Sequence, residues 1–257
     1  MLEDFKTDGS FLIHHFLSFF LKAQCKVCFL GLVQSFSHYS TVGINMLQAR
    51  EKGQLVFFEG LRNSLDMLLP ESDASDAEPQ PLSFLRYELS VESSLFFNSH
   101  LVYNDMSRWA SPVLLIDDLS VLLSLGVNPT AVLDFIHYCR MAVCSKQQGN
   151  MVTLVHNEDD LGDEDCDLVL HALTHQSSLI LQVHGLNTGY CRDVHGQVLI
   201  KHCLDHELTF RNSSYEYINN IALHTCPVTS VLEKREKIHV SLFLLNDFFS
   251  RMAKIVE

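Results

Sequence analysis

The sequence lacks the patterns by which many nucleotide-binding and hydrolytic enzymes hold their reacting groups. None of the 11 glycines is followed by lysine, so no G-x-x-x-x-G-K-[ST] phosphate loop exists. The dinucleotide fingerprint G-x-G-x-x-G, the hydrolase elbow G-x-S-x-G and the zinc-protease motif H-E-x-x-H are also absent. These absences argue against a conventional P-loop ATPase, a Rossmann dehydrogenase, an α/β-hydrolase and a zinc protease.

Positive charge is also scarce. Lysine and arginine together number 18 against 31 aspartates and glutamates, and the formal net charge is −13. A protein that binds nucleic acid by itself needs a positive surface for the phosphates. The charge balance therefore argues against an independent nucleic-acid-binding protein, but it is compatible with a subunit of a larger nucleic-acid-binding complex.

Targeting and membrane signals are weak. The N-terminus has no basic segment followed by an apolar core, which argues against a secretory signal. Residues 11–33 are apolar overall, but Lys22, Gln24 and Lys26 interrupt them, so a membrane span is not expected. The eight cysteines show no disulfide framework. We expect reduced thiols in a cytoplasmic protein, with a nuclear location also compatible.

The apolar pattern predicts an α/β fold. Runs of strand length alternate with segments of helical periodicity, which is typical of a mostly parallel sheet with helices on both faces. The expected strands are 27–33, 55–58, 113–116, 151–155 and 179–183, with antiparallel additions after residue 194. The expected helices are 10–23, 37–50, 129–143 and 168–175.

Two acidic segments read as solvated loops. Residues 70–81 contain four acids and three prolines, and residues 157–167 contain seven acids in eleven positions. A calcium-binding EF-hand loop with Gly162 at its sixth position would place Leu161 and Leu168 at positions that must supply oxygen ligands. We therefore reject a calcium site in the second loop.

Asp117 and Asp118 are the strongest local signal for a functional site. They follow the apolar run 113–116, and in nucleotide-binding sheets an acid at such a strand end holds Mg²⁺ or its water. An acid there more often ends a buried strand or caps the next helix, and the pattern alone favours that structural role. The nearest candidate for a phosphate loop, 6–10, carries Asp8 where an anionic phosphate would bind, which is electrostatically unfavourable.

The pair Cys25 and Cys28 forms one C-x-x-C motif. A redox motif of this kind usually opens a helix, and a structural zinc site needs a second such pair, which the sequence does not contain. Here the motif falls at the start of an expected strand, so ordinary thiols are the default interpretation.

Longer stretches resemble a known family, the sixth subunit of the Elongator complex. The stretches are KTDGSFLIHHFLSF at 6–19, CKVCF at 25–29, QSFSHYS at 34–40, REKGQLVFFEGL at 50–61, PVLLIDDLSVLLSLG at 112–126, AVLDFIHYCR at 131–140, GNMVTLVH at 149–156 and CRDVHGQ at 191–197. The resemblance thus extends over about residues 6–197 in order.

The resemblance implies a RecA-like fold without a working phosphate loop and a non-catalytic subunit, not an enzyme. It implies a hetero-hexameric ring with Elongator subunits four and five, which binds tRNA and supports modification of the wobble uridine by the catalytic Elongator subunits. No catalytic, cofactor-binding or metal-binding residue is carried over, and Asp117 and Asp118 receive no ATPase role. The alternative is an active RecA-like ATPase of the recombination or repair type, which the missing phosphate loop opposes.

The two ends of the chain depart from that family. The family has a strand before the KTDG segment, whereas here only the short, acidic residues 1–5 precede it, so the first strand is expected to be missing. Residues 1–230 are interpreted as one RecA-like domain and 231–257 as an added amphipathic tail. We expect either a gap or an inserted non-family strand beside 113–116, with 241–249 as the candidate segment.

Overall fold

The computed structural model describes residues 9–40, 45–60, 109–157, 164–184, 196–204, 209–218, 221–226 and 237–243. Its strands are β1 (Cys25–Gly31), β2 (Leu55–Glu59), β3 (Ala110–Asp117), β4 (Asn150–Asn157), β5 (Leu179–His184), β6 (Gly196–Leu204), β7 (Thr209–Ile218), β8 (Ile221–Cys226) and β9 (Lys237–Phe243). Its helices are α1 (Ser10–Lys22), α2 (Phe36–Ser40), α3 (Met46–Glu51), α6 (Ser120–Ser124), α7 (Pro129–Arg140), the π-helix η1 (Met141–Lys146) and α8 (Glu164–Gln176). Within these ranges, no helix has both the length and the apolarity needed to cross a membrane.

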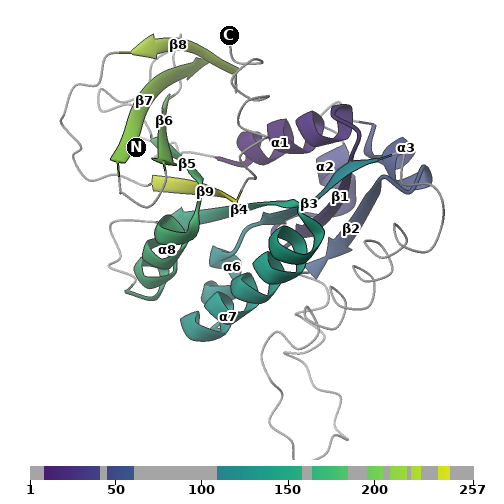
Figure 1. Cartoon of the computed structure of the whole chain (residues 1–257), viewed down its shortest axis with the longest axis horizontal. Coiled ribbons are helices and arrows are strands. Elements are labelled where there is room, and N and C mark those ends of the chain that lie inside the picture. The colour runs from purple at the N-terminus through teal and green to yellow at the C-terminus, as the bar shows by residue number, and fades with distance from the viewer. Residues whose placement is uncertain are drawn as a thin grey trace, which may run out of the picture.

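The strands form one sheet in the order β2-β1-β3-β4-β9-β5-β6-β7-β8. Strands β2, β1, β3 and β4 are parallel to one another, whereas the pairs from β4–β9 onward are antiparallel. Figure 1 shows α1 on one side of the sheet and α6, α7 and α8 on the other. The predicted α/β class with parallel strands, helices on both faces and antiparallel additions near the C-terminal side is confirmed, and among the described strands three of the eight pairs are parallel and five antiparallel.

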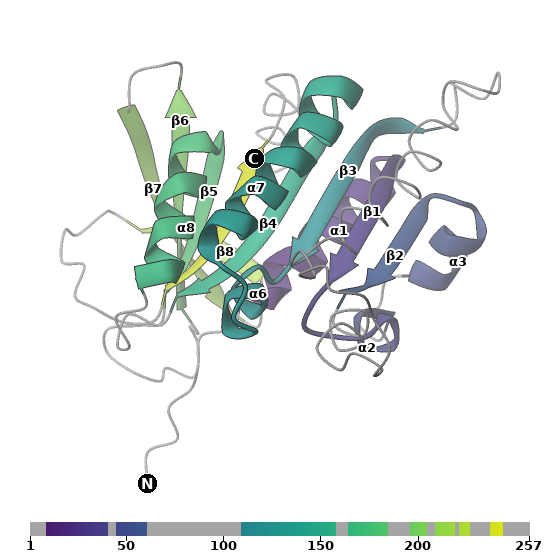
Figure 2. The same ribbon diagram turned by 90° about the horizontal axis from the view of Figure 1, so that it is seen from below.

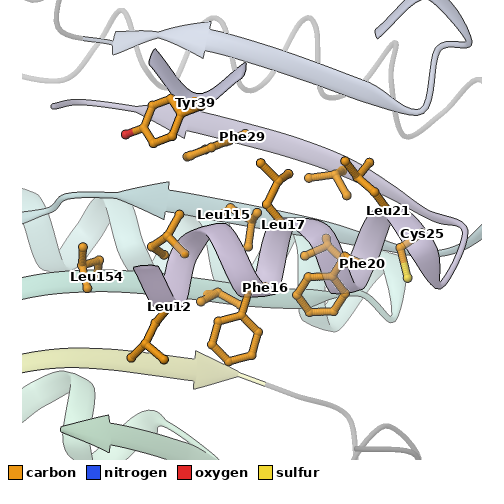
Figure 3. Packing of buried hydrophobic residues seen from close by; sticks show 14 of the residues in the cluster. Leu12, Phe16, Leu17, Phe20, Leu21, Cys25, Phe29, Tyr39, Leu115 and Leu154 are labelled. Atoms are coloured by element: carbon orange, nitrogen blue, oxygen red, sulfur yellow. The ribbon is translucent and has the colours of Figure 1, made fainter. Parts of the chain in front are cut away.

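One face of the sheet is covered mainly by α1. Because side chains alternate along a strand, Val27, Phe29, Val113 and Leu115 point to this face. Figure 3 shows the apolar side of α1 packed against these strands. Its seven buried residues are Phe11, Leu12, Ile13, Phe16, Leu17, Phe20 and Leu21. Burial of a large apolar side chain contributes about 1.5–3 kcal/mol, so this face is a major part of the core.

The opposite face of the sheet packs against α6, α7 and α8, which lie in front of the strands in Figure 2. Cys28, Leu30, Leu114 and Ile116, the intervening residues of β1 and β3, point to this second face. Burial on both faces explains why the central strands read as continuous apolar runs in the sequence.

Local capping sets the helix boundaries. Asn128 accepts a hydrogen bond from the Thr130 N–H at 2.8 Å and starts α7, with proline at its first turn as predicted. The prediction of a single helix over 37–50 is wrong, because α2 ends at Ser40 and a second helix begins later. The Asn45 side chain accepts the Gln48 N–H at 2.9 Å and caps α3.

The prediction of a gap beside 113–116 is also wrong. Strand β3 is paired on one side with β1 and on the other with β4, both of which were expected strands. Both backbone edges of β3 therefore have partners. The late segment β9 does enter the sheet, but it lies between β4 and β5 and overlaps 241–249 only at its end.

Several expectations fall partly or wholly on residues outside the described ranges. These are the first strand before KTDG, the loop 70–81 and most of the tail 231–257. The acidic run 157–167 is not all loop, since Asn157 ends β4 and Glu164, Asp165 and Asp167 stand in the first turn of α8. Carboxylates are favourable there because the N-terminus of a helix carries partial positive charge.

Candidate functional site

The candidate site is the carboxyl end of β3, where Asp117 is the last residue of the buried strand and Asp118 follows it. The two residues are only 2% and 3% exposed. The backbone carbonyl of Asp117 accepts the Leu32 N–H at 2.5 Å, which continues the contact between β3 and the residue after β1. Both carboxylates thus stand inside the fold, where their charge must be balanced by hydrogen bonds.

Asp117 is bonded to helix α2. Its Oδ2 accepts a hydrogen bond from the Tyr39 hydroxyl at 2.6 Å. The Tyr39 ring is itself buried, with its centroid 4.7 Å from that of Phe29 and 5.7 Å from that of Phe57. Burial, followed by the negative charge of Asp117 and the hydrogen bond to it, raises the pKa of Tyr39. The phenol therefore stays protonated and donates to the carboxylate.

Asp118 joins α6 to β4. Its Oδ1 accepts both the Ser120 backbone N–H at 2.9 Å and the Ser120 hydroxyl at 2.6 Å. Its Oδ2 is in hydrogen-bond contact with Nδ1 of His156 on β4. The Ser120 hydroxyl in turn accepts the His156 backbone N–H at 3.2 Å. Ser120 is the first residue of α6 and Leu119 is its N-cap residue, so Asp118 lies one residue before the cap and accepts the first N–H of the helix.

This arrangement is suited to holding elements together. Tyr39, Ser120 and His156 contact Oδ2 of Asp117 and both carboxylate oxygens of Asp118, so these oxygens already have protein partners. Across the described residues, no group of three or more histidine, cysteine, aspartate or glutamate side chains is arranged to hold a metal ion. The geometry supports a structural role, in which hydrogen bonds from these acids hold α2, α6 and β4 together at the carboxyl end of β3.

The two thiols of the C-x-x-C motif do not form a common site. Both lie on β1 and are buried, as the strand interpretation requires. Cys25 belongs to the core on the α1 face, whereas Cys28 belongs to the core on the α7 face. Positions separated by three residues point to opposite sides of a strand, so these thiols can neither pair nor share a zinc ion.

Sequence analysis missed the partners of the acids and one pair of nitrogen donors. Tyr39 and His156 are 78 and 38 residues from the acids they contact, and no spacing signal connects them. His171 and His175 bring their Nε2 atoms within 3.3 Å of each other on α8. Their four-residue separation on a predicted helix was the signal that could have found them.

Comparison with known proteins identifies the family. The family model described as Elongation complex protein 6 matches residues 1–218. The chain belongs to this family. Elongator complex protein 6 of Homo sapiens is 54% identical over 209 residues, covering 78% of this chain and 77% of the human protein. Elongator complex protein 6 of Danio rerio is 54% identical over 205 residues, covering 77% of each chain. The predicted family resemblance is confirmed.

A solved structure supports the fold of this Elongator family member. It is an uncharacterized protein from Pyrococcus horikoshii, crystallised with an unknown peptide, with a TM-score of 0.55 and 14% sequence identity. The match covers 85% of this chain and 87% of the archaeal chain. At this identity the likeness concerns the fold alone.

The family model matches the chain as far as residue 218, and strand β9 lies beyond that residue.

Proposed function

We propose that the protein is a non-catalytic subunit of an Elongator complex, placed in a RecA-like hetero-hexameric ring with Elongator subunits four and five. The ring binds tRNA and supports modification of the wobble uridine by the catalytic subunits. Membership of the Elongation complex protein 6 family, over residues 1–218, is the observation that carries this proposal. The relatives named above are Elongator complex proteins, which supports the same assignment.

The candidate site supports a structural rather than a catalytic role. An ATPase of this fold class needs a phosphate loop, and no glycine of this chain is followed by lysine. It also needs a strand-end acid that reaches Mg²⁺. Here Asp117 accepts from Tyr39 and Asp118 accepts from Ser120, so these acids hold α2 and α6 to the sheet.

The second candidate is an active RecA-like ATPase of the recombination or repair type. The RecA-like sheet and the acids at the end of β3 are the observations that favour it. The missing phosphate loop and the engaged carboxylates oppose it. A measurement of ATP binding distinguishes the two functions directly.

Charge indicates how the subunits divide the work. With a net charge of −13, this chain repels the phosphates of tRNA. The positive surface that tRNA requires is therefore supplied by the other ring subunits, and this chain contributes the packing that closes the ring. The protein acts in the cytoplasm, and a nuclear pool is compatible with the same role; imaging of the tagged full-length chain in cells tests this placement.

Co-expression with Elongator subunits four and five tests the assembly. We expect one complex of hexameric mass by native mass spectrometry, containing all three proteins. The matched control omits this chain and should give smaller assemblies of subunits four and five. A complex of the same mass in the control, with this chain eluting separately, would refute the ring assignment.

The assembled ring should bind tRNA, whereas the isolated chain should not. A gel-shift titration with unmodified tRNA at two salt concentrations measures this, because phosphate contacts make affinity fall as salt rises. Equal tRNA affinity of the isolated chain and of the ring would contradict the proposed division of work.

A further inference from the structure

Helix α8 carries two exposed imidazoles in direct contact. His171 and His175 are four residues apart on the helix and both are exposed. Their Nε2 atoms are 3.3 Å apart and their ring centroids 4.4 Å apart, with the planes inclined at 64°. Two nitrogen donors thus converge on the surface at a place that takes no part in the Asp117–Asp118 network.

The separation of the two nitrogens fits a single metal ion. An ion that lies about 2.05 Å from both Nε2 atoms, the usual zinc–imidazole distance, forms an N–metal–N angle of roughly 107° across the 3.3 Å separation. Tetrahedral coordination, which zinc prefers, requires about 109°. The nitrogen separation therefore fits one ion. The rings must turn so that both lone pairs face the ion, and the hydrogen bond between the two Nε2 atoms is given up on binding.

The helix holds this pair on a rigid support. The opposite side of α8 is buried in the core through Cys166, Val169, Leu170 and Leu173. The positions of the two imidazoles are therefore set by a packed element rather than by a loop. This anchoring favours chelation, because the second imidazole meets the ion at a high effective concentration.

The charge near the pair is negative toward the start of α8 and positive at its end. The first turn of α8 carries Glu164, Asp165 and Asp167, and all three are exposed. One guanidinium also reaches this helix, because Arg140 on α7 donates from Nη1 to Oε1 of Gln176, the residue after His175, at 3.2 Å. Asp167 stands one helical turn before His171, about 6 Å along the axis and within one Debye length of roughly 8 Å at physiological salt, so its carboxylate raises the local concentration of a divalent cation.

We propose that His171 and His175 form a surface site for one zinc-class transition-metal dication. Both Nε2 atoms act as ligands, and water fills the other positions, since the described residues supply no set of three protein ligands. Imidazole donors select zinc, nickel or copper over magnesium or calcium, which prefer oxygen ligands. The site is independent of the proposed ring function.

Histidine labelling in the full-length chain tests the site at single residues. The metal-stripped protein is treated with diethyl pyrocarbonate with and without added ZnCl₂, and each labelled peptide is quantified by mass spectrometry. We expect zinc to reduce the labelling of His171 and His175 together, with both half-protected at the same zinc concentration. His137 is the internal control. It is exposed on α7 and has no second histidine three or four residues away on the helix, so zinc should not change its labelling.

Three variants distinguish chelation from independent binding. His171→Ala, His175→Ala and the double variant keep helix propensity high, so α8 is expected to fold. In His171→Ala, the midpoint for protection of His175 should rise by roughly tenfold or more, because the chelating partner is gone. In calorimetric titrations with ZnCl₂, each single variant should lose the same one equivalent of tight zinc as the double variant.

The opposite results would overturn the site. Labelling of His171 and His175 that zinc leaves unchanged contradicts binding at these residues. Protection of His175 at an unchanged midpoint in His171→Ala shows two independent histidines. A zinc stoichiometry and affinity in the double variant equal to those of the parent chain would place all bound zinc elsewhere.

Discussion

The bond between Tyr39 and Asp117 is the contact of the candidate site whose removal is easiest to interpret. Replacement of Tyr39 by phenylalanine deletes one hydroxyl and keeps the ring. The ring packs against Phe29 and Phe57, so its hydrophobic contribution is unchanged by the substitution. What is lost is a 2.6 Å hydrogen bond to a carboxylate that is 2% exposed.

The expected loss of stability follows from the charge and burial of the acceptor. A hydrogen bond to a charged group contributes about 1.5–3 kcal/mol, and water cannot easily replace the hydroxyl at a buried carboxylate. We therefore expect Tyr39→Phe to lower the free energy of unfolding by about 1.5–3 kcal/mol at pH 8. Urea denaturation followed by circular dichroism measures it.

The pH dependence provides a second, independent signature. Burial and the neighbouring Asp117 raise the pKa of Tyr39 above its ordinary value of 10.0. Above pH 10, the unfolded chain releases the phenol proton while the native protein keeps it, so the stabilisation is lost as pH rises, by about 1.4 kcal/mol per unit. Phenylalanine has no such proton. The difference between parent and Tyr39→Phe should thus be constant from pH 7 to 9 and narrow by about 1.4 kcal/mol at pH 11.

Tyr138→Phe is the matched control. Tyr138 is 37% exposed on α7, and its substitution should change stability by less than about 0.5 kcal/mol. Equal effects of the two substitutions would refute the reasoning. So would a Tyr39→Phe difference that does not change between pH 8 and pH 11, because the phenol would then not be held neutral by its surroundings.

Three further predictions concern nucleotide binding and the sheet. Isothermal titration of the isolated chain with Mg²⁺-ATP should give no binding heat; binding abolished by Asp117→Ala would contradict this. Gly149→Ala should lower the unfolding free energy by about 1–3 kcal/mol in urea, because the added Cβ would lie 2.5 Å from the Pro112 carbonyl oxygen; a neutral result would show that the backbone shifts at no cost. Val240→Pro removes a backbone N–H from the middle of β9 and should cost at least about 1–3 kcal/mol, whereas Val240→Thr, which keeps the N–H, should cost less; equal melting of the two would contradict the position of β9 between β4 and β5.

The strands and helix ends that depend on a short stretch of sequence could be predicted. The strands at 113–116 and 151–155 are short apolar runs, and burial on both faces makes such runs continuous. Pro129 indicated the start of α7, because the first turn of a helix does not need the backbone N–H that proline lacks. The single helix over 37–50 failed because apolar periodicity does not show that Asn45 caps a second helix.

The site was only half predictable, for a similar reason. The position of Asp117 and Asp118 follows from the buried strand that precedes them, and this was visible in the sequence. Their partners depend on where α2 and β4 lie in space. A tyrosine and a histidine at distant positions carry no periodicity that connects them to an acid, so Tyr39 and His156 became recognisable only in the fold.

The position of β9 illustrates why the order of strands is harder to predict than their existence. Strands β4 and β5 are both antiparallel to β9, so they run in the same direction, as a crossover connection through α8 requires. A crossover connection requires its two strands to be parallel, but it does not determine whether they are hydrogen-bonded neighbours in the sheet. Here they stand two strand spacings apart, roughly 9–10 Å, and one strand fits between them. Without β9, the facing backbone edges of both strands would lose their partners in the middle of the sheet. The sequence analysis expected either a gap or an inserted strand beside β3, and β3 shows neither, because it pairs with β1 and β4. Apolar burial looks the same in every central strand, and only the pairing of backbone groups identifies the neighbour.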